Sequence, residues 1–204
     1  LENMALIPGT VGACPIQNIG AYGAEVAEFI ETVEAYNRST GQFKRLGNAD
    51  CGFGYRDSRF KREIDEWVIC AVEFRLDKNR PLQMNYAGVA EELAAMAVDT
   101  PTALHLAEAI SRIRTRKLPN PDLVGNAGSF FKNPIVSTER ANELAARFPT
   151  MPHYSAGSGR TKLAAGWLIE QAGWKGKRIG NAGVHAEHAL VLVNHGGASG
   201  AEIL

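Results

Sequence analysis

The pattern of apolar positions along two stretches of the chain predicts strands. In residues 29 to 37, apolar and β-branched residues alternate with glutamates, and Ser39-Thr40-Gly41 forms a turn signal before the short segment 42 to 46. This pattern predicts a hairpin. Residues 67 to 76 form an almost uninterrupted apolar run, which predicts a further strand.

A spacing of three and four residues between apolar positions predicts the helices. Leu104, Ala107, Ile110 and Ile113 follow this spacing after Thr100-Pro101, which has the form of an N-cap and a first helical residue, and Pro119 ends the pattern. Further helices are expected at residues 138 to 148 and 162 to 172, and further strands at Phe130-Phe131 and at residues 189 to 194. The fold class is therefore mixed α+β.

Several segments are defined by turn and cap residues instead of periodicity. The first 23 residues are rich in glycine and indicate turns, and Asn48 is a candidate cap for a short helical turn. Residues 77 to 96 fit neither pattern. Leu118-Pro119-Asn120-Pro121 is a candidate linker, and Ser199 with Glu202 has the spacing of a capping box that begins a helix.

Composition and charge exclude some classes of function. The 204 residues include 22 basic and 22 acidic ones, and 45% are hydrophobic, as in ordinary globular proteins. A formal net charge of zero does not favour nucleic acid as a partner. No apolar run reaches the roughly 18 residues of a membrane span, and no basic residue precedes Arg38, so we expect a cytoplasmic protein without membrane contact.

The three cysteines and two histidines suggest no metal site. Cys14, Cys51 and Cys70 have no paired spacing, which indicates free thiols in a reducing compartment. His185 and His188 are three residues apart, but no acidic or cysteine motif accompanies them. We expect no metal.

Two glycine-rich segments could bind a ligand through their backbone. Glycines lack a Cβ atom, so successive N–H groups can approach a phosphate, although one such segment taken alone is better explained as a turn without a ligand. The first segment comprises Ile7, Pro8, Gly9, Thr10, Val11, Gly12 and Ala13. The second runs from Ile16 to Gly23 and includes Asn18, Gly20, Tyr22 and Gly23.

Three further clusters carry charge or a nucleophile. Arg112, Arg114, Arg116 and Lys117 lie near a predicted helix end, where they could offset the helix dipole, bind a diphosphate or bind nucleic acid. Tyr55-Arg56-Asp57-Ser58 joins a cation to a possible carboxylate partner. In Gly125-Asn126-Ala127-Gly128-Ser129, the serine follows a glycine turn and would open a strand. The sequence around Ser129 lacks the GxSxG motif, so a serine hydrolase is not indicated.

Taken together and in order, these segments resemble the flavin-dependent UDP-N-acetylenolpyruvoylglucosamine reductases of bacterial peptidoglycan synthesis. The resemblance rests on the two glycine segments, Phe-Gly-Tyr-Arg-Asp-Ser from Phe53, Lys-Leu-Pro from Lys117, Gly-Asn-Ala-Gly-Ser-Phe-Phe-Lys-Asn-Pro from Gly125, and Lys-Leu-Ala-Ala-Gly-Trp-Leu-Ile from Lys162. Residues 77 to 99 resemble the insertion of the longer subclass of this family.

The resemblance implies a fold, cofactors and site residues. Residues 1–118 would be the second half of an FAD-binding domain of the vanillyl-alcohol-oxidase/PCMH type, and residues 119–204 most of a substrate-binding domain. FAD would pass hydride from NADPH to a UDP-sugar enolpyruvyl ether. Arg56 would stabilise developing charge, and Ser129 would donate the proton. The glycine segments would bind FAD, and the residues implied at the substrate are Tyr55, Tyr86, Lys117, Asn133 and Lys175.

The resemblance also implies that two functional elements lie outside this sequence. The family's first glycine-rich flavin loop would precede Leu1, and a further acidic catalytic residue would follow Leu204. We therefore expect weak FAD retention and little turnover from these 204 residues alone. Another flavin oxidoreductase of the same fold and a non-catalytic UDP-sugar-binding fragment stay open as alternatives, and the oligomeric state is not indicated.

Overall fold

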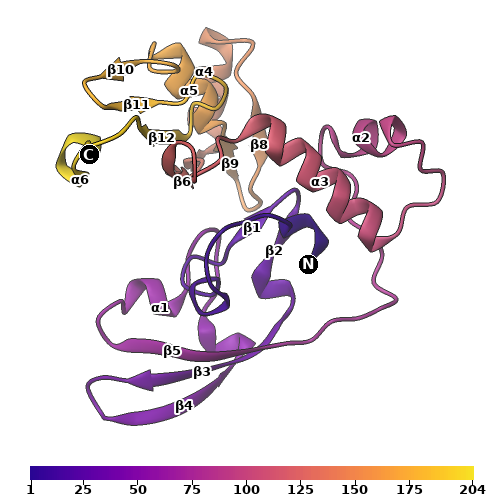
Figure 1. Ribbon diagram of the computed structural model, residues 1–204, viewed down its shortest axis with the longest axis vertical. Coiled ribbons are helices and arrows are strands. Elements are labelled where there is room, and N and C mark those ends of the chain that lie inside the picture. Colours follow the sequence, from indigo (N-terminus) through magenta and orange to yellow (C-terminus); the bar gives the residue numbers. More distant parts are fainter. The chain divides into compact units, whose positions relative to one another are not determined.

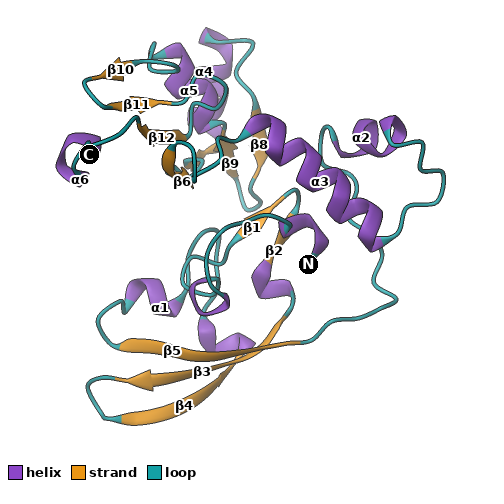
Figure 2. Ribbon diagram, viewed as in Figure 1, coloured by secondary structure: helices purple, strands orange, loops and turns teal.

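The computed structural model describes residues 1–204, which form two compact units, Leu1–Arg114 and Thr115–Leu204. Both units combine short strands with helices (Figures 1 and 2). The α+β class is therefore confirmed. No helix combines the length and the hydrophobicity required to cross a bilayer.

The first unit is built on an antiparallel sheet with strand order β4-β3-β5. The predicted hairpin and the following strand are confirmed. Val33 and Ala35 of the central strand are fully buried, because this face packs on the turns formed by the N-terminal residues. The strands are β3 (Ile30–Asn37), β4 (Gln42–Gly47) and β5 (Trp67–Phe74), and a short hairpin joins β1 (Gly20–Ala21) to β2 (Ala24–Glu25).

Three helices complete the first unit. They are α1 (Arg59–Arg62), α2 (Val89–Ala95) and α3 (Ala103–Lys117), the last of which continues to the start of the second unit. A second core lies between α2 and α3 and includes Leu106, Ile110 and Ile113. The predicted stripe was partly wrong, because Leu104 is 77% exposed and Leu106 is buried instead.

The local caps also differ from two predictions. Thr102 rather than Thr100 caps α3, because its hydroxyl accepts a hydrogen bond from the N–H of His105. Asn48 lies inside the helical turn Asn48–Cys51, and its amide instead donates to the carbonyl oxygens of Ala27 and Ile30. The partners of Asn48 lie 21 and 18 residues away, so the local sequence does not indicate them.

The second unit contains two antiparallel sheets. One has the order β10-β11-β12-β6 and the other the order β7-β9-β8. The strands are β6 (Gly125–Ser129), β7 (Ile135–Ser137), β8 (His153–Ser155), β9 (Arg160–Leu163), β10 (Arg178–Ile179), β11 (Ala182–Val184) and β12 (Val191–Asn194), and the helices are α4 (Thr138–Arg147), α5 (Ala165–Gln171) and α6 (Gly200–Ile203).

The helix α4, the strand at residues 189 to 194 and the capping box of Ser199 and Glu202 are confirmed, with bounds that differ by up to two residues. Lys162 was expected to begin a helix but lies in β9, and α5 begins three residues later. The strand expected at Phe130-Phe131 was wrong, because β6 ends at Ser129. Ser129 therefore closes a strand instead of opening one.

The three cysteines are free thiols. Cys14 and Cys51 are buried in the core of the first unit, whereas Cys70 is exposed on β5. Burial raises the pKa of Cys14 and of Cys51 to about 11.

Candidate functional site

The first glycine segment is exposed at Gly9 and Thr10 and packs on the sheet at Gly12. Gly9 has a φ of +116°, and a Cβ atom placed there would meet no atom within 4 Å. The N–H groups of Gly9 and Thr10 have no acceptor in the chain. Gly12 packs on β5, since its Cβ position lies 3.8 Å from the carbonyl oxygen of Ile69. The segment thus offers two hydrogen-bond donors and open space to a ligand.

The second glycine segment is held by its asparagine. Asn18 is 1% exposed and adopts a φ of +44°. Its amide nitrogen donates to Glu25 Oε2 (2.8 Å) and to the carbonyl oxygen of Gly54 (2.9 Å), and its oxygen accepts from the N–H of Ala27 (3.0 Å). Both amide hydrogens are therefore engaged inside the protein, so the side chain positions neighbouring loops.

The same segment ends in a tight turn. Tyr22 and Gly23 connect β1 to β2 with φ values of +49° and +86°, the two positive values that a type I′ hairpin turn requires. Glycine meets this requirement without strain, whereas tyrosine does not. The turn directs Tyr22 toward Tyr86, whose ring centroid lies 5.1 Å away in an edge-to-face arrangement.

Arg56 is fixed by the second glycine segment. Its Nη1 lies 3.2 Å from Glu25 Oε1, and its Nη2 donates to the carbonyl oxygen of Gly20. The guanidinium also lies over the Tyr55 ring, 5.2 Å from the centroid. Gly20 makes this approach possible, because a Cβ atom at that position would lie 2.9 Å from Nη1. Arg56 itself has a φ of +53° in the bridge between Gly54 and Asp57.

The carboxylate partner of Arg56 was misidentified from the sequence. Asp57 follows Arg56 directly, but it pairs with Arg62, and Glu25 pairs with Arg56 from 31 residues away. Glu25 also accepts from Asn18, so one carboxylate connects the two residues. The sequence signal for Glu25 is its position two residues after the end of the second glycine segment.

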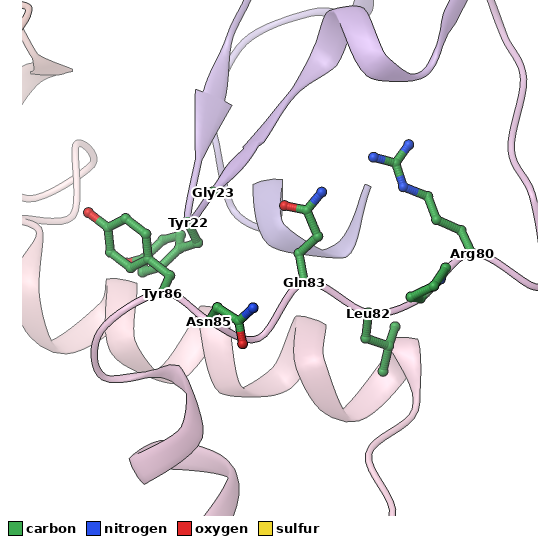
Figure 3. A pocket seen from close by; sticks show the side chains of 8 residues that line it. Tyr22, Gly23, Arg80, Leu82, Gln83, Asn85 and Tyr86 are labelled. Carbon is green, nitrogen blue, oxygen red and sulfur yellow. The ribbon is translucent and has the colours of Figure 1, made fainter. Parts of the chain in front are cut away.

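A shallow open cavity of about 500 Å³ lies beside Tyr22 in the first unit. Figure 3 shows the rings of Tyr22 and Tyr86 side by side, with Gln83 and Arg80 along the same extended segment. Arg80 is held by Glu28 and by the Phe29 ring, 4.4 Å from its guanidinium carbon. Tyr86 is 51% exposed. Its aromatic face is therefore accessible to a ligand.

Ser129 is the last residue of β6 in the second unit. It lies opposite Val191 of β12, and the next residue, Phe130, donates its N–H to the carbonyl oxygen of Leu190 (2.8 Å). Gly128 precedes it with a φ of +72°. Ser129 is exposed. The pairing of Ser129 with Val191 and the hydrogen bond of Phe130 thus fix the strand end that carries the hydroxyl.

The second unit also contains the other predicted substrate residues. Asn133 accepts the N–H of Ala165 through Oδ1 (2.9 Å) at the start of α5, and Lys175 Nζ lies 3.0 Å from Glu170 Oε1. Burial, and then the charges of His185, Lys117 and Lys175, lower the pKa of His188. The structure shows no group of three or more His, Cys, Asp or Glu residues that could hold a metal ion.

By its fold the chain is a two-unit α+β protein with ligand-accessible glycine loops in the first unit. Residues 119–204 match the family model for the C-terminal domain of UDP-N-acetylenolpyruvoylglucosamine reductase. The UDP-N-acetylenolpyruvoylglucosamine reductases of Xanthomonas axonopodis pv. citri and Xanthomonas campestris pv. campestris are each 58% identical to it over its whole length. The chain spans 59% of the length of these relatives.

A solved structure shows the same likeness. The crystal structure of UDP-N-acetylenolpyruvylglucosamine reductase from Thermus caldophilus matches with a TM-score of 0.64 and 26% identity. The match covers 99% of this chain and 56% of the Thermus chain. In sequence and in fold, the chain is therefore similar to the UDP-N-acetylenolpyruvoylglucosamine reductases.

Proposed function

We propose that the protein carrying this chain reduces the enolpyruvyl group of UDP-N-acetylglucosamine enolpyruvate to give UDP-N-acetylmuramate, with NADPH as the hydride source and FAD as the carrier. The relatives' names state the substrate class. The observation that carries the proposal in this chain is Arg56, a half-buried guanidinium fixed by Glu25 and by the Gly20 carbonyl beside the glycine segments.

The residues of the first unit fit FAD. The free N–H groups of Gly9 and Thr10 are suitable donors to a diphosphate or a ring carbonyl, and the open space at Gly9 leaves room for either. Leu6 and Val11 are 61% and 58% exposed, so apolar side chains are available to a planar ring. We therefore assign FAD binding to the first unit.

Arg56 and Ser129 would serve different steps of the reduction. Bound FAD supplies a hydride, taken from NADPH, to the terminal carbon of the enol ether. Negative charge then develops toward the substrate carboxylate, and the Arg56 guanidinium would stabilise it. The neighbouring carbon accepts the proton of the Ser129 hydroxyl. The double bond thus gains one hydride and one proton, and Ser129 regains a proton from solvent.

Tyr55, Tyr86, Lys117, Asn133 and Lys175 would bind the substrate. Lysine ammonium groups suit a diphosphate as point charges. Tyr86 presents an exposed ring that can cover a ligand. The Lys175 ammonium is paired with Glu170, so a diphosphate would have to compete with this carboxylate.

Separate half-reactions test the proposal. The natural full-length polypeptide that contains these 204 residues is loaded with FAD, reduced anaerobically with NADPH and mixed with the enolpyruvyl UDP-sugar. We expect flavin absorbance to be lost and then regained in equal amounts. A protein that binds no FAD contradicts the proposal. Reduction by NADPH without reoxidation by the sugar would instead favour another flavin oxidoreductase, and sugar binding without flavin a binding protein.

A further inference from the structure

The side chain of Asn3 joins two segments that are distant in the sequence. It lies in the short 3₁₀ helix Glu2–Met4 and is 2% exposed. Its Nδ2 atom donates to the carbonyl oxygen of Tyr22 (2.8 Å) and to that of Gln83 (2.9 Å). No backbone N–H donates to either oxygen. One amide group therefore supplies a donor to each of two carbonyls, which lie 19 and 80 residues away along the chain.

The two segments that Asn3 joins form walls of the cavity beside Tyr22. Tyr22 and Gly23 belong to the turn between β1 and β2, and Gln83 and Tyr86 belong to the extended segment that lies next to it (Figure 3). Tyr22 has a φ of +49°, a conformation that a residue other than glycine keeps only when its surroundings fix it. The hydrogen bond from Asn3 to the Tyr22 carbonyl is one such contact. Asn3 itself does not line the cavity, but it holds two of its walls together.

The position of the Tyr86 ring depends on this link. Tyr86 follows Gln83 by three residues, and its ring centroid lies 5.1 Å from that of Tyr22. The side chain of Gln83 adds to the same attachment, since its Nε2 lies 3.3 Å from Glu28 Oε2. Tyr86 is 51% exposed, so packing fixes its ring only in part. Where the ring lies over the cavity therefore follows from where the backbone at Gln83 is held.

Resting on the substrate contact proposed above for Tyr86, we propose that Asn3 is a positioning residue that holds the Tyr86 ring ready for the enolpyruvyl UDP-sugar. A ligand that binds against a mobile ring loses affinity to the ordering of that ring, and a backbone that is already held reduces this loss. In this role Asn3 needs no contact with the reacting atoms. It should therefore affect the affinity for the sugar more than the rate of its reduction.

The test is a double-mutant cycle between Asn3 and Tyr86 in the natural full-length polypeptide. Asn3→Ala, Tyr86→Ala and the double variant are loaded with FAD, reduced with NADPH and mixed anaerobically with increasing concentrations of the enolpyruvyl UDP-sugar. We expect Asn3→Ala to raise the half-saturating sugar concentration about two- to tenfold, the cost of ordering one large side chain, and to change the limiting reoxidation rate by less than about twofold. In the Tyr86→Ala background, Asn3→Ala should have no further effect on the sugar affinity.

Asn48→Ala is the matched control. The Nδ2 atom of Asn48 also donates to two carbonyl oxygens, those of Ala27 and Ile30, at 2.8 Å each, but none of these residues lines the cavity. Asn48→Ala should leave the sugar affinity unchanged, whatever its effect on stability. An equal loss of affinity in Asn3→Ala and Asn48→Ala would overturn the role of Asn3, because general destabilisation would then explain both.

The outcomes separate this inference from the proposed function. The same fold-change for Asn3→Ala with and without the Tyr86 ring, or a Tyr86→Ala protein with the sugar affinity of the wild type, overturns the role of Asn3 and leaves the reduction itself standing. Failure of the wild type to reduce the sugar overturns both. If Asn3→Ala does not fold, hydrogen exchange of the Asn3 side-chain amide in the wild type decides. Sugar binding should slow this exchange, because coupling between two sites is reciprocal, and an unchanged exchange rate overturns the inference.

Discussion

At the scale of single residues, the site of the first unit depends on one glycine. Gly20 accommodates the guanidinium of Arg56, and its own carbonyl oxygen accepts from that group. The requirement is for space, because a Cβ atom there would lie 2.7 Å from the carbonyl oxygen of Ala24 as well as 2.9 Å from Arg56 Nη1. A single methyl group would therefore separate β1 from β2 and displace the arginine.

We predict that Gly20→Ala destabilises the protein by about 1–3 kcal/mol, the usual range for overpacking. Urea denaturation measures the change. Gly12→Ala is the matched control, because the nearest atom to its Cβ position is 3.8 Å away, and it should be neutral or slightly stabilising. Equal changes in the free energy of unfolding for the two substitutions would show that close contact of the added methyl group with Arg56 and Ala24 does not cause the destabilisation.

At the scale of elements, the connection between β11 and β12 holds two histidines in a tight loop. The N–H of His185 donates to the carbonyl oxygen of Val191 (2.9 Å), and the N–H of Val191 donates to that of His188 (3.0 Å). The Nδ1 atoms of both rings are buried without a hydrogen-bond partner. Val191 also lies opposite Ser129 in the sheet, so this loop supports the strand end that carries the serine.

This loop predicts a pH-dependent stability. The pKa of His188 is lowered in the fold from its ordinary value of 6.5, first by burial and then by His185, Lys117 and Lys175. The unfolded chain therefore binds more protons near that value, and the free energy of unfolding should fall as the pH decreases through about 6.5. Urea denaturation at about pH 7.5 and about pH 5.5 measures the slope.

His188→Asn should reduce this slope, whereas His195→Asn, at an exposed position outside the loop, should leave it unchanged. If His188→Asn retains the full wild-type slope, other groups account for the acid sensitivity. The comparison isolates the loop because both variants remove one imidazole from the second unit.

The elements also show what local patterns can predict. The hairpin of β3 and β4 and the helix α4 follow from alternation and from helical spacing, which act over a few residues. The strands β10 and β11 have two and three residues, too few for a periodic pattern, and they exist because β12 pairs with β11. In α3, Ile110 and Ile113 are buried as predicted, whereas Leu104 is exposed and Leu106 is buried in its place.

At the scale of the whole molecule, the proposed reaction needs residues from both units. Arg56 belongs to Leu1–Arg114 and Ser129 to Thr115–Leu204. Both proposed roles belong to the half-reaction with the enol ether, which follows the reduction of the flavin by NADPH. The two half-reactions can therefore be measured separately in one protein.

We predict that Ser129→Ala leaves flavin reduction by NADPH nearly unchanged and slows reoxidation by the enolpyruvyl UDP-sugar by about 10²- to 10⁴-fold, the usual contribution of a positioned acid. Rapid mixing under anaerobic conditions measures both rates. Ser137→Ala, which removes only the N-cap of α4 in the same unit, should affect neither rate directly. Equal losses in both half-reactions for Ser129→Ala would argue against proton donation.

The sequence alone determined the fold class, the main hairpin, the principal helices and the family resemblance, because periodicity and ordered motifs are properties of neighbouring residues. It did not determine the pairing of Arg56 with Glu25, the hydrogen bond from the Asn18 amide to the carbonyl oxygen of Gly54, or the burial of Arg114. Only the tertiary structure decided these, because each depends on residues brought together across tens to a hundred positions of chain. The energies of such contacts come from packing and desolvation, which no local pattern records.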